Sequence, residues 1–272
     1  MKTTAICFPF DLFGSAGTGR GAEAVCDALR EILDDNQAET VATRADAYRS
    51  RVEIREFTFE TVDAYRDWRS EARSAVQSAL GMDRFLVWLT GNHLGALPVY
   101  EELGASKDAV VVQFDAHLDI QNFAESTKEP SHGNFLLHAT GALPTIINIG
   151  HRDLLLHAEH VQKTYRRAIS ATELSNRFEA VLDEVVKSCR PAERVFLDVD
   201  CDVFDPTFFP AVSHPVPFGL RPSDIVRVID AAWSERIEGI AISEFDPGRD
   251  RNDECLATLA WLIEYILLKR HE

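Results

Sequence analysis

The sequence has little of what exported, membrane-bound or nucleic-acid-binding proteins need. No apolar run approaches the roughly 20 residues of a membrane-spanning helix. The N-terminus has only a short apolar stretch and no small-residue cleavage signal, so we expect no secretion signal. The 28 Lys and Arg are outnumbered by 44 Asp and Glu, and the formal net charge of −16 opposes binding to nucleic acid or to an anionic membrane surface. We therefore expect neither nucleic acid nor a membrane as a partner.

Cysteine is also sparse. The five cysteines are scattered along the chain, odd in number and without a CxxC pair. This spacing is unlike a disulfide framework and is typical of a protein in a reducing compartment. We therefore expect a cytoplasmic location.

Apolar residues, in contrast, are abundant. Hydrophobic residues make up 46% of the 272 residues, enough for one large core. Short apolar runs alternate with longer helical patterns, which predicts an α/β fold with three αβα layers and a mostly parallel central sheet. The predicted strands are Thr3–Phe8, Val52–Phe57, Arg84–Leu89, Ala109–Phe114, Thr145–Ile149, Arg194–Val199 and Ile237–Ser243, and the predicted helices are Gly21–Leu33, Thr61–Leu80, Thr172–Ser188, Pro222–Trp233 and Leu256–Lys269.

Three carboxylate-rich motifs follow predicted strands. Residues 110–119 read VVVQFDAHLD, residues 194–206 read RVFLDVDCDVFDP, and residues 240–247 read IAISEFDP. Because ligands of parallel sheets bind beyond the carboxyl ends of the strands, these segments are expected to converge on one crevice. So many carboxylates would be costly to pack together without cations, so the pattern predicts a cluster of divalent metals.

Each motif offers alternating ligand atoms. In an extended segment Asp115, His117 and Asp119 share one face, whereas the alternative interpretation is a polar loop that covers the sheet edge. Asp200 and Asp202 alternate in the same way, and Asp205 before a proline is expected to stabilise a turn.

Three further residues follow strands or lie in loops. His93 follows the run FLVWLTGN, and its alternative is a buried core histidine. His132 lies in the loop SHGNF, where a plain surface histidine is the alternative. Glu244 should face the same crevice, unless it forms a salt bridge with an arginine such as Arg249.

Together these segments resemble the ureohydrolases, the family of arginase, agmatinase and formimidoylglutamase. DAHLD matches the family's DAHxD motif, and DVDCDVFDP resembles its SxDxDxxDP motif with Asp198 at the position of the first Ser. TGNH, SHGNF, IGHRD and SEFDP resemble its GGDH segment, His-Gly loop, GxR segment and final Glu motif. The resemblance covers the chain from about Gly14 to the last helix. It implies an arginase-like fold, with residues 1–272 as a single ureohydrolase-like domain.

The resemblance also implies a pair of divalent ions. Manganese is the expected metal because oxygen ligands dominate, with nickel, cobalt or zinc as alternatives. The negative charge of such a site favours a small cationic guanidino or amidino substrate. One ion would be bound by His93, Asp115, Asp119 and Asp200, and the other by His117, Asp115, Asp200 and Asp202.

Catalytic roles follow for three residues. Glu244 would hold a planar guanidinium through paired hydrogen bonds, and Asp119 would orient the attacking hydroxide. His132 would carry a proton to the departing amine. We therefore expect a binuclear-manganese hydrolase that cleaves a guanidino C–N bond, for example in agmatine or a guanidino acid, and releases urea.

Several positions depart from the arginase pattern. Gln121 and Lys128 stand where arginases have an Asn and a Ser that hold the amino-acid carboxylate, and Leu155 replaces an Asp that binds the α-amino group. Loss of the ammonium partner argues against arginine as substrate. Lys128 either meets an anionic tail or is a solvated surface residue.

Three positions beside the expected ligands also differ from the family. Asn92, Leu94 and Asp198 replace the usual Asp, Ser and Ser, and such positions tune metal affinity or preference. Cys201, between two expected ligands, is interpreted as a small core residue.

Other functions stay open at this stage. Formimidoylglutamate hydrolysis is a close variant. A deacetylase-type metal amidohydrolase is a second alternative, which a tyrosine facing the site would favour, and none is apparent beside the motifs. A catalytically inactive metal-binding relative is the third alternative. Since the family commonly forms trimers or hexamers, the resemblance implies a homo-oligomer.

Overall fold

The central feature of the computed structural model is one parallel sheet. The structure describes residues 1–272 except 60, 81–83, 107 and 124–127. The sheet has the order β2-β1-β3-β8-β7-β4-β5-β6, and every neighbouring pair is parallel. The strands are β1 (Lys2–Phe8), β2 (Val52–Glu56), β3 (Arg84–Thr90), β4 (Ala109–Phe114), β5 (Thr145–His151), β6 (Tyr165–Ser170), β7 (Arg194–Asp200) and β8 (Ile237–Ser243).

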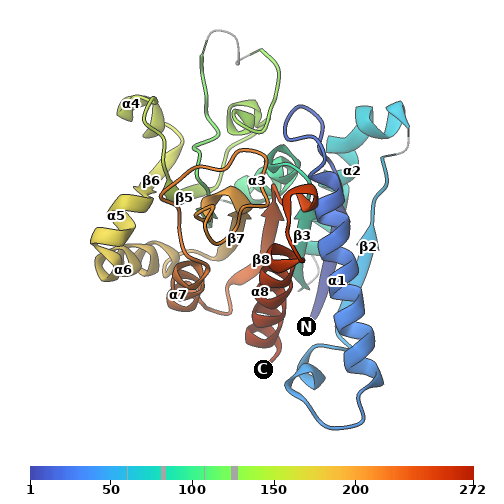
Figure 1. The fold of residues 1–272 in the computed structure, drawn as a ribbon. Helices are drawn as coiled ribbons and strands as arrows, with labels where there is room; N and C mark the ends of the chain where they lie inside the picture. Colours follow the sequence, from blue (N-terminus) through green and yellow to red (C-terminus); the bar gives the residue numbers. More distant parts are fainter. Residues whose placement is uncertain (60, 81–83, 107, 124–127) are drawn as a thin grey trace.

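Helices cover both faces of the sheet, which confirms the three-layer prediction. One face packs against α1, α5, α6, α7 and α8, and the other against α2 and α3. Figure 1 shows α1 and α8 side by side in front of the strands, with both chain ends near the lower edge of the sheet. The helices are α1 (Gly19–Ala38), α2 (Val62–Leu80), α3 (Leu97–Gly104), α4 (Ala158–Val161), α5 (Ala171–Asn176), α6 (Phe178–Cys189), α7 (Pro222–Ala232) and α8 (Glu254–His271), with short 3₁₀ helices η1 (Arg44–Ala47), η2 (His93–Ala96), η3 (Phe135–His138), η4 (Cys201–Val203) and η5 (Pro247–Arg249).

The continuous apolar runs of the central strands result from burial on both faces. In β3, Val87 and Leu89 belong to the core beneath α1 and α8, whereas Leu86 and Trp88 belong to the core beneath α2 and α3. Successive side chains of a strand point to opposite faces, so a strand covered on both sides has no polar alternation.

Several elements differ from the prediction, among them the short helix α4, which was not predicted. Strand β6 was missed because its sequence YRRAIS carries two arginines, which an edge strand tolerates since it is only partly buried. Helix α3 was missed because of Pro98, which lies in its first turn, where no backbone N–H is needed. The predicted helix Thr172–Ser188 is two helices, interrupted at Arg177 with φ −134° and ψ 37°.

The sheet order explains why the motifs meet. Strands β3, β8, β7 and β4 are consecutive neighbours in the sheet, and each is followed by one of the expected site segments. Their carboxyl ends lie along the same edge because all four strands are parallel. Within the described ranges, no helix has the length and apolarity that crossing a membrane requires.

Candidate metal centre

His93 lies at the centre of a buried group of carboxylates. Its Nδ1 is 3.2 Å from Asp115 Oδ2, 2.9 Å from Asp119 Oδ2 and 3.1 Å from Asp200 Oδ2. The His93 side chain is 1% exposed. One ion in contact with these four atoms would have three oxygen ligands and one nitrogen ligand.

A second group of ligand atoms lies beside the first and shares Asp115 with it. His117 Nδ1 is 2.8 Å from Asp202 Oδ2 and 3.9 Å from Asp115 Oδ1. The structure thus forms two overlapping clusters, His93–Asp115–Asp200 and Asp115–His117–Asp202, each with ligand atoms within 4.8 Å of one another. All six sequence-predicted ligands are brought together.

The loops that carry these ligands are held by their own carboxylates. Asp115 Oδ1 accepts a hydrogen bond from the backbone N–H of His117 at 2.6 Å, and Asp202 Oδ1 accepts one from Ala116 at 3.1 Å. Asp200 Oδ1 accepts from the N–H of Asp202 at 2.9 Å. The loops after β4 and β7 are therefore fixed to each other beside the candidate ligands.

The extended geometry expected for residues 115–119 is wrong. Strand β4 ends at Phe114, and the following residues form bends, with Asp119 in the left-handed region at φ 47°. Asp202 likewise lies in the 3₁₀ helix η4 rather than in a strand. The side chains converge because the chain curls over the sheet edge, not because alternate residues of one strand share a face.

Electrostatics in this group are those of closely packed anions. Burial raises the pKa of Asp115 to about 8, and Asp119 adds to this shift. Burial opposes the charged form of His117, but Asp202 outweighs it and raises the pKa of His117 to about 10. Burial likewise opposes ionised Asp202, whose pKa is nevertheless lowered to about 2 by His117. A cation that lies among these ligand atoms would therefore be strongly stabilised.

The residues present fit a pair of divalent cations. His93 Nδ1 and Asp115 Oδ2 are buried without a hydrogen-bond partner in the described part of the chain. Such atoms are costly to bury unless they are paired or coordinate a metal. A donor set of four carboxylates and two imidazoles suits manganese and is also compatible with nickel, cobalt or zinc.

Glu244 and His132 meet beside this group. Glu244 Oε1 is 3.3 Å from His132 Nδ1, and the side chains are 4% and 30% exposed. Burial opposes protonation of His132, but its hydrogen bond with Glu244 and the charge of Glu244 raise its pKa. The alternative salt bridge of Glu244 with Arg249 is wrong, because Arg249 pairs with Asp246 at 3.0 Å.

Two buried residues, Asp198 and Tyr100, support His93 on the side of its ring away from the other ligands. The sequence had not indicated this connection. Asp198 Oδ2 lies 2.8 Å from His93 Nε2 and also accepts a hydrogen bond from the hydroxyl of Tyr100. A second tyrosine, Tyr165, donates to the backbone carbonyl of Leu118. Tyrosines therefore lie close to the motifs, contrary to expectation, but both hydroxyls are buried and already hydrogen-bonded.

The partly buried guanidinium of Arg152, in the segment IGHRD, fixes the loop after β7. It donates hydrogen bonds to the carbonyls of Gly150, Asp202, Val203 and Val216 at 2.9, 2.6, 2.8 and 3.0 Å. This side chain was not singled out from the sequence, because its partners are backbone atoms that no motif reveals.

The unusual residues of the TGNHL segment have structural partners. Asn92 Nδ2 donates to the carbonyl of Leu12 at 2.8 Å, which holds the N-terminal loop against the site. Leu94 is completely buried in the core beneath α2 and α3, as Cys201 is in the core on the other side of the sheet. The side chain of Lys128 is exposed, and Leu155 is 76% exposed.

One more histidine, His214, lies beside His132. His214 Nδ1 and His132 Nδ1 are each 3.4 Å from the hydroxyl of Ser15, and the two imidazole rings are 5.1 Å apart. Burial, followed by the charge of His132, lowers the pKa of His214. His214 follows no strand and belongs to no motif of the sequence, so only the fold connects it to His132.

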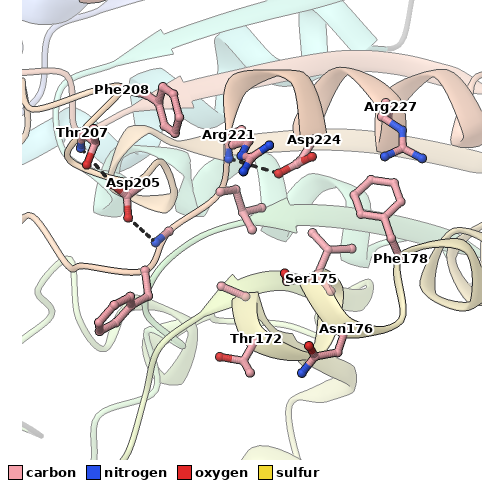
Figure 2. A pocket seen from close by; sticks show the side chains of 15 residues that line it. Thr172, Ser175, Asn176, Phe178, Asp205, Thr207, Phe208, Arg221, Asp224 and Arg227 are labelled. Atoms are coloured by element: carbon pink, nitrogen blue, oxygen red, sulfur yellow. Dashed lines mark hydrogen bonds between the residues drawn. The ribbon is translucent and has the colours of Figure 1, made fainter.

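Asp205 supports a neighbouring cleft rather than the candidate metal centre. Its two carboxylate oxygens accept the backbone N–H groups of Thr207 at 2.9 Å and Gly219 at 3.0 Å, as expected for a turn (Figure 2). The cleft has a volume of about 710 Å³ and lies between α5 and α7, with Thr172 and Arg227 in its lining. None of the six candidate ligands lines it.

The sequences that resemble this chain point to one protein family. The sequence model of the Arginase family matches residues 2–268. A formimidoylglutamase of Staphylococcus aureus (strain MSSA476) is 23% identical over 263 residues, which cover 93% of this chain and 80% of that protein. A mitochondrial arginase of Medicago truncatula is 27% identical over 184 residues, covering 63% of this chain and 51% of that protein. An uncharacterised 32.2 kDa protein of Methanothermus fervidus is 29% identical over 171 residues, with 62% and 58% covered.

Solved structures share the fold. An arginase from Bacillus subtilis superimposes with a TM-score of 0.79 at 21% identity, covering 98% of both chains. The agmatine ureohydrolase of Thermoplasma volcanium gives a TM-score of 0.78 at 23% identity, covering 99% of this chain and 89% of that one. With the family match over residues 2–268, the chain belongs to the arginase family, whose members are metal-dependent hydrolases of guanidino C–N bonds.

Proposed function

We propose that this protein is a binuclear-manganese ureohydrolase that cleaves the guanidino C–N bond of a small substrate, such as agmatine or a guanidino acid, and releases urea. The observation that carries the proposal is the meeting of Glu244 and His132, 3.3 Å apart, beside a buried group of six ligand residues. A carboxylate and an imidazole in this position supply what hydrolysis needs besides the metal, namely a substrate anchor and a proton carrier.

The six ligand residues divide between two ions. His93, Asp119 and Asp200 would hold one ion, His117 and Asp202 the other, and Asp115, which belongs to both clusters, would contact both. Asp200 would contact the second ion as well. When bound, the ions would lower the pKa of water so that hydroxide is available at neutral pH.

Glu244 would anchor the substrate. Its carboxylate is almost fully buried, so a planar cationic guanidinium or amidinium is the natural partner for its two oxygens. The backbone N–H of His93 already donates to Glu244 Oε1 at 2.9 Å, which fixes the carboxylate before substrate arrives. Glu244 would therefore position the carbon that is attacked.

His132 and Asp119 would handle protons. His132, whose pKa is raised, could deliver a proton to the nitrogen of the leaving amine as the C–N bond breaks. The carboxylate of Asp119 would accept a hydrogen bond from the attacking hydroxide and orient it.

The surroundings favour a substrate other than arginine. Leu155 is exposed and apolar at the position where an α-amino group would need an anion. Exposed Lys128 carries positive charge, which suits a guanidino acid with an anionic tail. Agmatine lacks the α-carboxylate and therefore needs no partner for that group, although it keeps the terminal amine.

Formimidoylglutamate is the second candidate substrate. Its formimino group is also a planar amidine that can bind a carboxylate, and the S. aureus relative that spans 93% of this chain is named formimidoylglutamase. Its hydrolysis would release formamide instead of urea. A deacetylase-type reaction is less well supported, because the hydroxyls of Tyr100 and Tyr165 are held by Asp198 and a backbone carbonyl.

We also propose that residues 1–272 act as a single ureohydrolase-like domain, in a cytoplasmic homo-oligomer such as a trimer or hexamer. The continuous eight-stranded sheet and the family match over residues 2–268 support one domain. Five buried free cysteines suit a reducing compartment.

A substrate panel tests the proposal. Purified protein with added manganese is incubated with agmatine, guanidinobutyrate, arginine and formimidoylglutamate, and urea and formamide are measured. Urea from agmatine or guanidinobutyrate supports the leading function, and formamide from formimidoylglutamate supports the second. If neither product forms from any substrate in the presence of bound metal, the proposed activity is wrong.

A further inference from the structure

The two candidate ligand histidines are supported very differently. The His93 ring is buried, with Nδ1 toward the carboxylates of the centre and Nε2 2.8 Å from Asp198 Oδ2. A histidine that offers the lone pair of Nδ1 must carry its proton on Nε2, and Asp198 is placed to accept that proton's hydrogen bond. The hydrogen bond therefore selects the tautomer that can bind an ion.

Tyr100 extends this support to a third residue. Its hydroxyl donates to the same Asp198 Oδ2, while Asp198 Oδ1 has no hydrogen-bond partner in the part of the chain that the structure describes. The ring of Phe135 packs against both, 4.8 Å from the His93 ring and 5.6 Å from that of Tyr100. His93 is therefore held in position by hydrogen bonds and by packing.

His117 lacks such support. It lies in a bend after β4, its side chain is 33% exposed, and among the described residues no hydrogen bond is formed by its Nε2. Its Nδ1 faces Asp202 at 2.8 Å. Its ring must therefore lose more conformational freedom than that of His93 when an ion binds.

We propose that the Tyr100–Asp198–His93 chain makes the ion position at His93 the tighter of the two, so that the protein fills the His93 position first and the His117 position last. A carboxylate behind a ligand histidine fixes its orientation and increases its basicity, and loss of such a partner typically weakens metal binding about 10- to 100-fold. A Ser at this position would be a neutral partner, so Asp198 adds an anion that the family pattern lacks. Asp198 and Tyr100 are positioning residues that act through His93.

The inference rests on the two-ion centre of the proposed function but needs no substrate. Metal-free protein is titrated with manganese, and free manganese is followed by electron paramagnetic resonance. We expect two equivalents per chain in two classes that differ at least about tenfold in affinity. His117→Ala identifies the classes, because it should abolish the weaker class and retain the tighter one.

Three variants separate the contributions of the chain. Asp198→Ser should weaken the tighter class about 10- to 100-fold and leave the weaker class within about twofold. Asp198→Asn can keep an oxygen toward both His93 and Tyr100 while it removes the charge, so a smaller loss is expected. Tyr100→Phe removes only the hydrogen bond between Tyr100 and Asp198 and should weaken the tighter class a few-fold at most.

Tyr48→Phe is the matched control. Tyr48 is another buried tyrosine whose hydroxyl donates to a carboxylate, Glu264, at 2.5 Å, but it lies on the far side of the protein between α1 and α8. It should not change either affinity class. Thermal melting of the metal-free variants shows whether each is folded. If Asp198→Ser does not fold, the test uses Tyr100→Phe, the mildest of the three changes.

The outcomes are distinct. Two classes of equal affinity, or a variant of Asp198 that weakens the class lost in His117→Ala, would overturn the inference. Wild-type protein that binds no manganese would overturn the metal centre together with it. Ordered binding without any urea or formamide release would leave the inference standing and refute only the proposed reaction.

Discussion

Glu244 Oε1 accepts a hydrogen bond from the backbone N–H of His93 at 2.9 Å. This contact joins the proposed substrate anchor directly to the segment that carries a candidate metal ligand, although the two residues are 151 positions apart. The contact uses Oε1, the same oxygen that lies 3.3 Å from His132 Nδ1.

We expect Glu244→Gln to lower kcat/KM by at least about 100-fold, roughly 2.7 kcal/mol, while manganese content stays at two equivalents per chain. Gln retains an oxygen for the His93 N–H but loses the charge and one acceptor for the guanidinium. Steady-state kinetics and metal analysis of the same preparations check this. Normal kinetics in Glu244→Gln would remove Glu244 from substrate binding.

His132→Asn should lower kcat about 10²- to 10⁴-fold, the range typical of general acid–base catalysis, without loss of metal. Glu244 raises the pKa of His132 against the opposing effect of burial, and wild-type activity should fall as the pH rises through that pKa, because the proton donor is lost. His138→Asn is the control, since His138 lies in η3 and its backbone carbonyl accepts a hydrogen bond from the Arg69 guanidinium at 2.8 Å, away from the ligand residues. A pH–rate profile in which the alkaline limb is unchanged by His132→Asn would contradict the role.

Arg152→Met should destabilise the protein by about 3 kcal/mol or more, because it leaves buried carbonyls of the β7 loop without their donor. For a chain of this size that corresponds to a fall in Tm of roughly 6–12 °C. Since Arg152 also holds the backbone of Asp202, manganese binding should weaken. Denaturant unfolding of the metal-free protein and manganese titration measure the two effects. A variant of normal stability would show that the loop does not depend on this guanidinium.

How far the sequence determines the site differs from residue to residue. Strand ends and the DAHLD and DVDCD motifs were sufficient to predict that ligand residues converge, because a parallel sheet places all carboxyl ends at one edge. The backbone of Asp119, at φ 47°, was not predictable, since no local pattern distinguishes a strand end from a loop that curls back.

The supporting contacts were harder to predict than the ligands. Tyr100 reaches Asp198 only because α3, which packs against β4, lies in the same core as Phe196 of β7, a relationship that depends on the assembled layers. Strand β6 escaped prediction because Arg166 and Arg167 interrupt its apolar pattern, which an edge strand permits. Tertiary packing, more than local propensity, decides such features.

The C-terminal histidine offers a test of pH-dependent stability. His271 Nε2 lies 2.8 Å from the hydroxyl of Thr3, and burial together with the charge of Arg51 lowers the pKa of His271 from 6.5 to about 4. The unfolded chain therefore binds a proton at higher pH than the folded one, so stability from this residue is complete above about pH 6.5 and is lost as the pH falls toward about 4.

The free energy of unfolding of wild-type protein and His271→Gln, measured from pH 7.5 to 4, isolates this contribution, because all other titrating groups are shared. We expect the difference between the two proteins to change mainly between pH 6.5 and 4, with the wild type losing more stability than the variant. A constant difference across this range would show that His271 titrates normally in the folded protein.

The most direct test of the two-ion centre is anomalous diffraction from crystals soaked in manganese. The account predicts two anomalous peaks per chain within coordination distance of the candidate ligands, one beside His93 and one beside His117, with Asp115 between them. Peaks elsewhere on the protein, or none at these histidines, would contradict it.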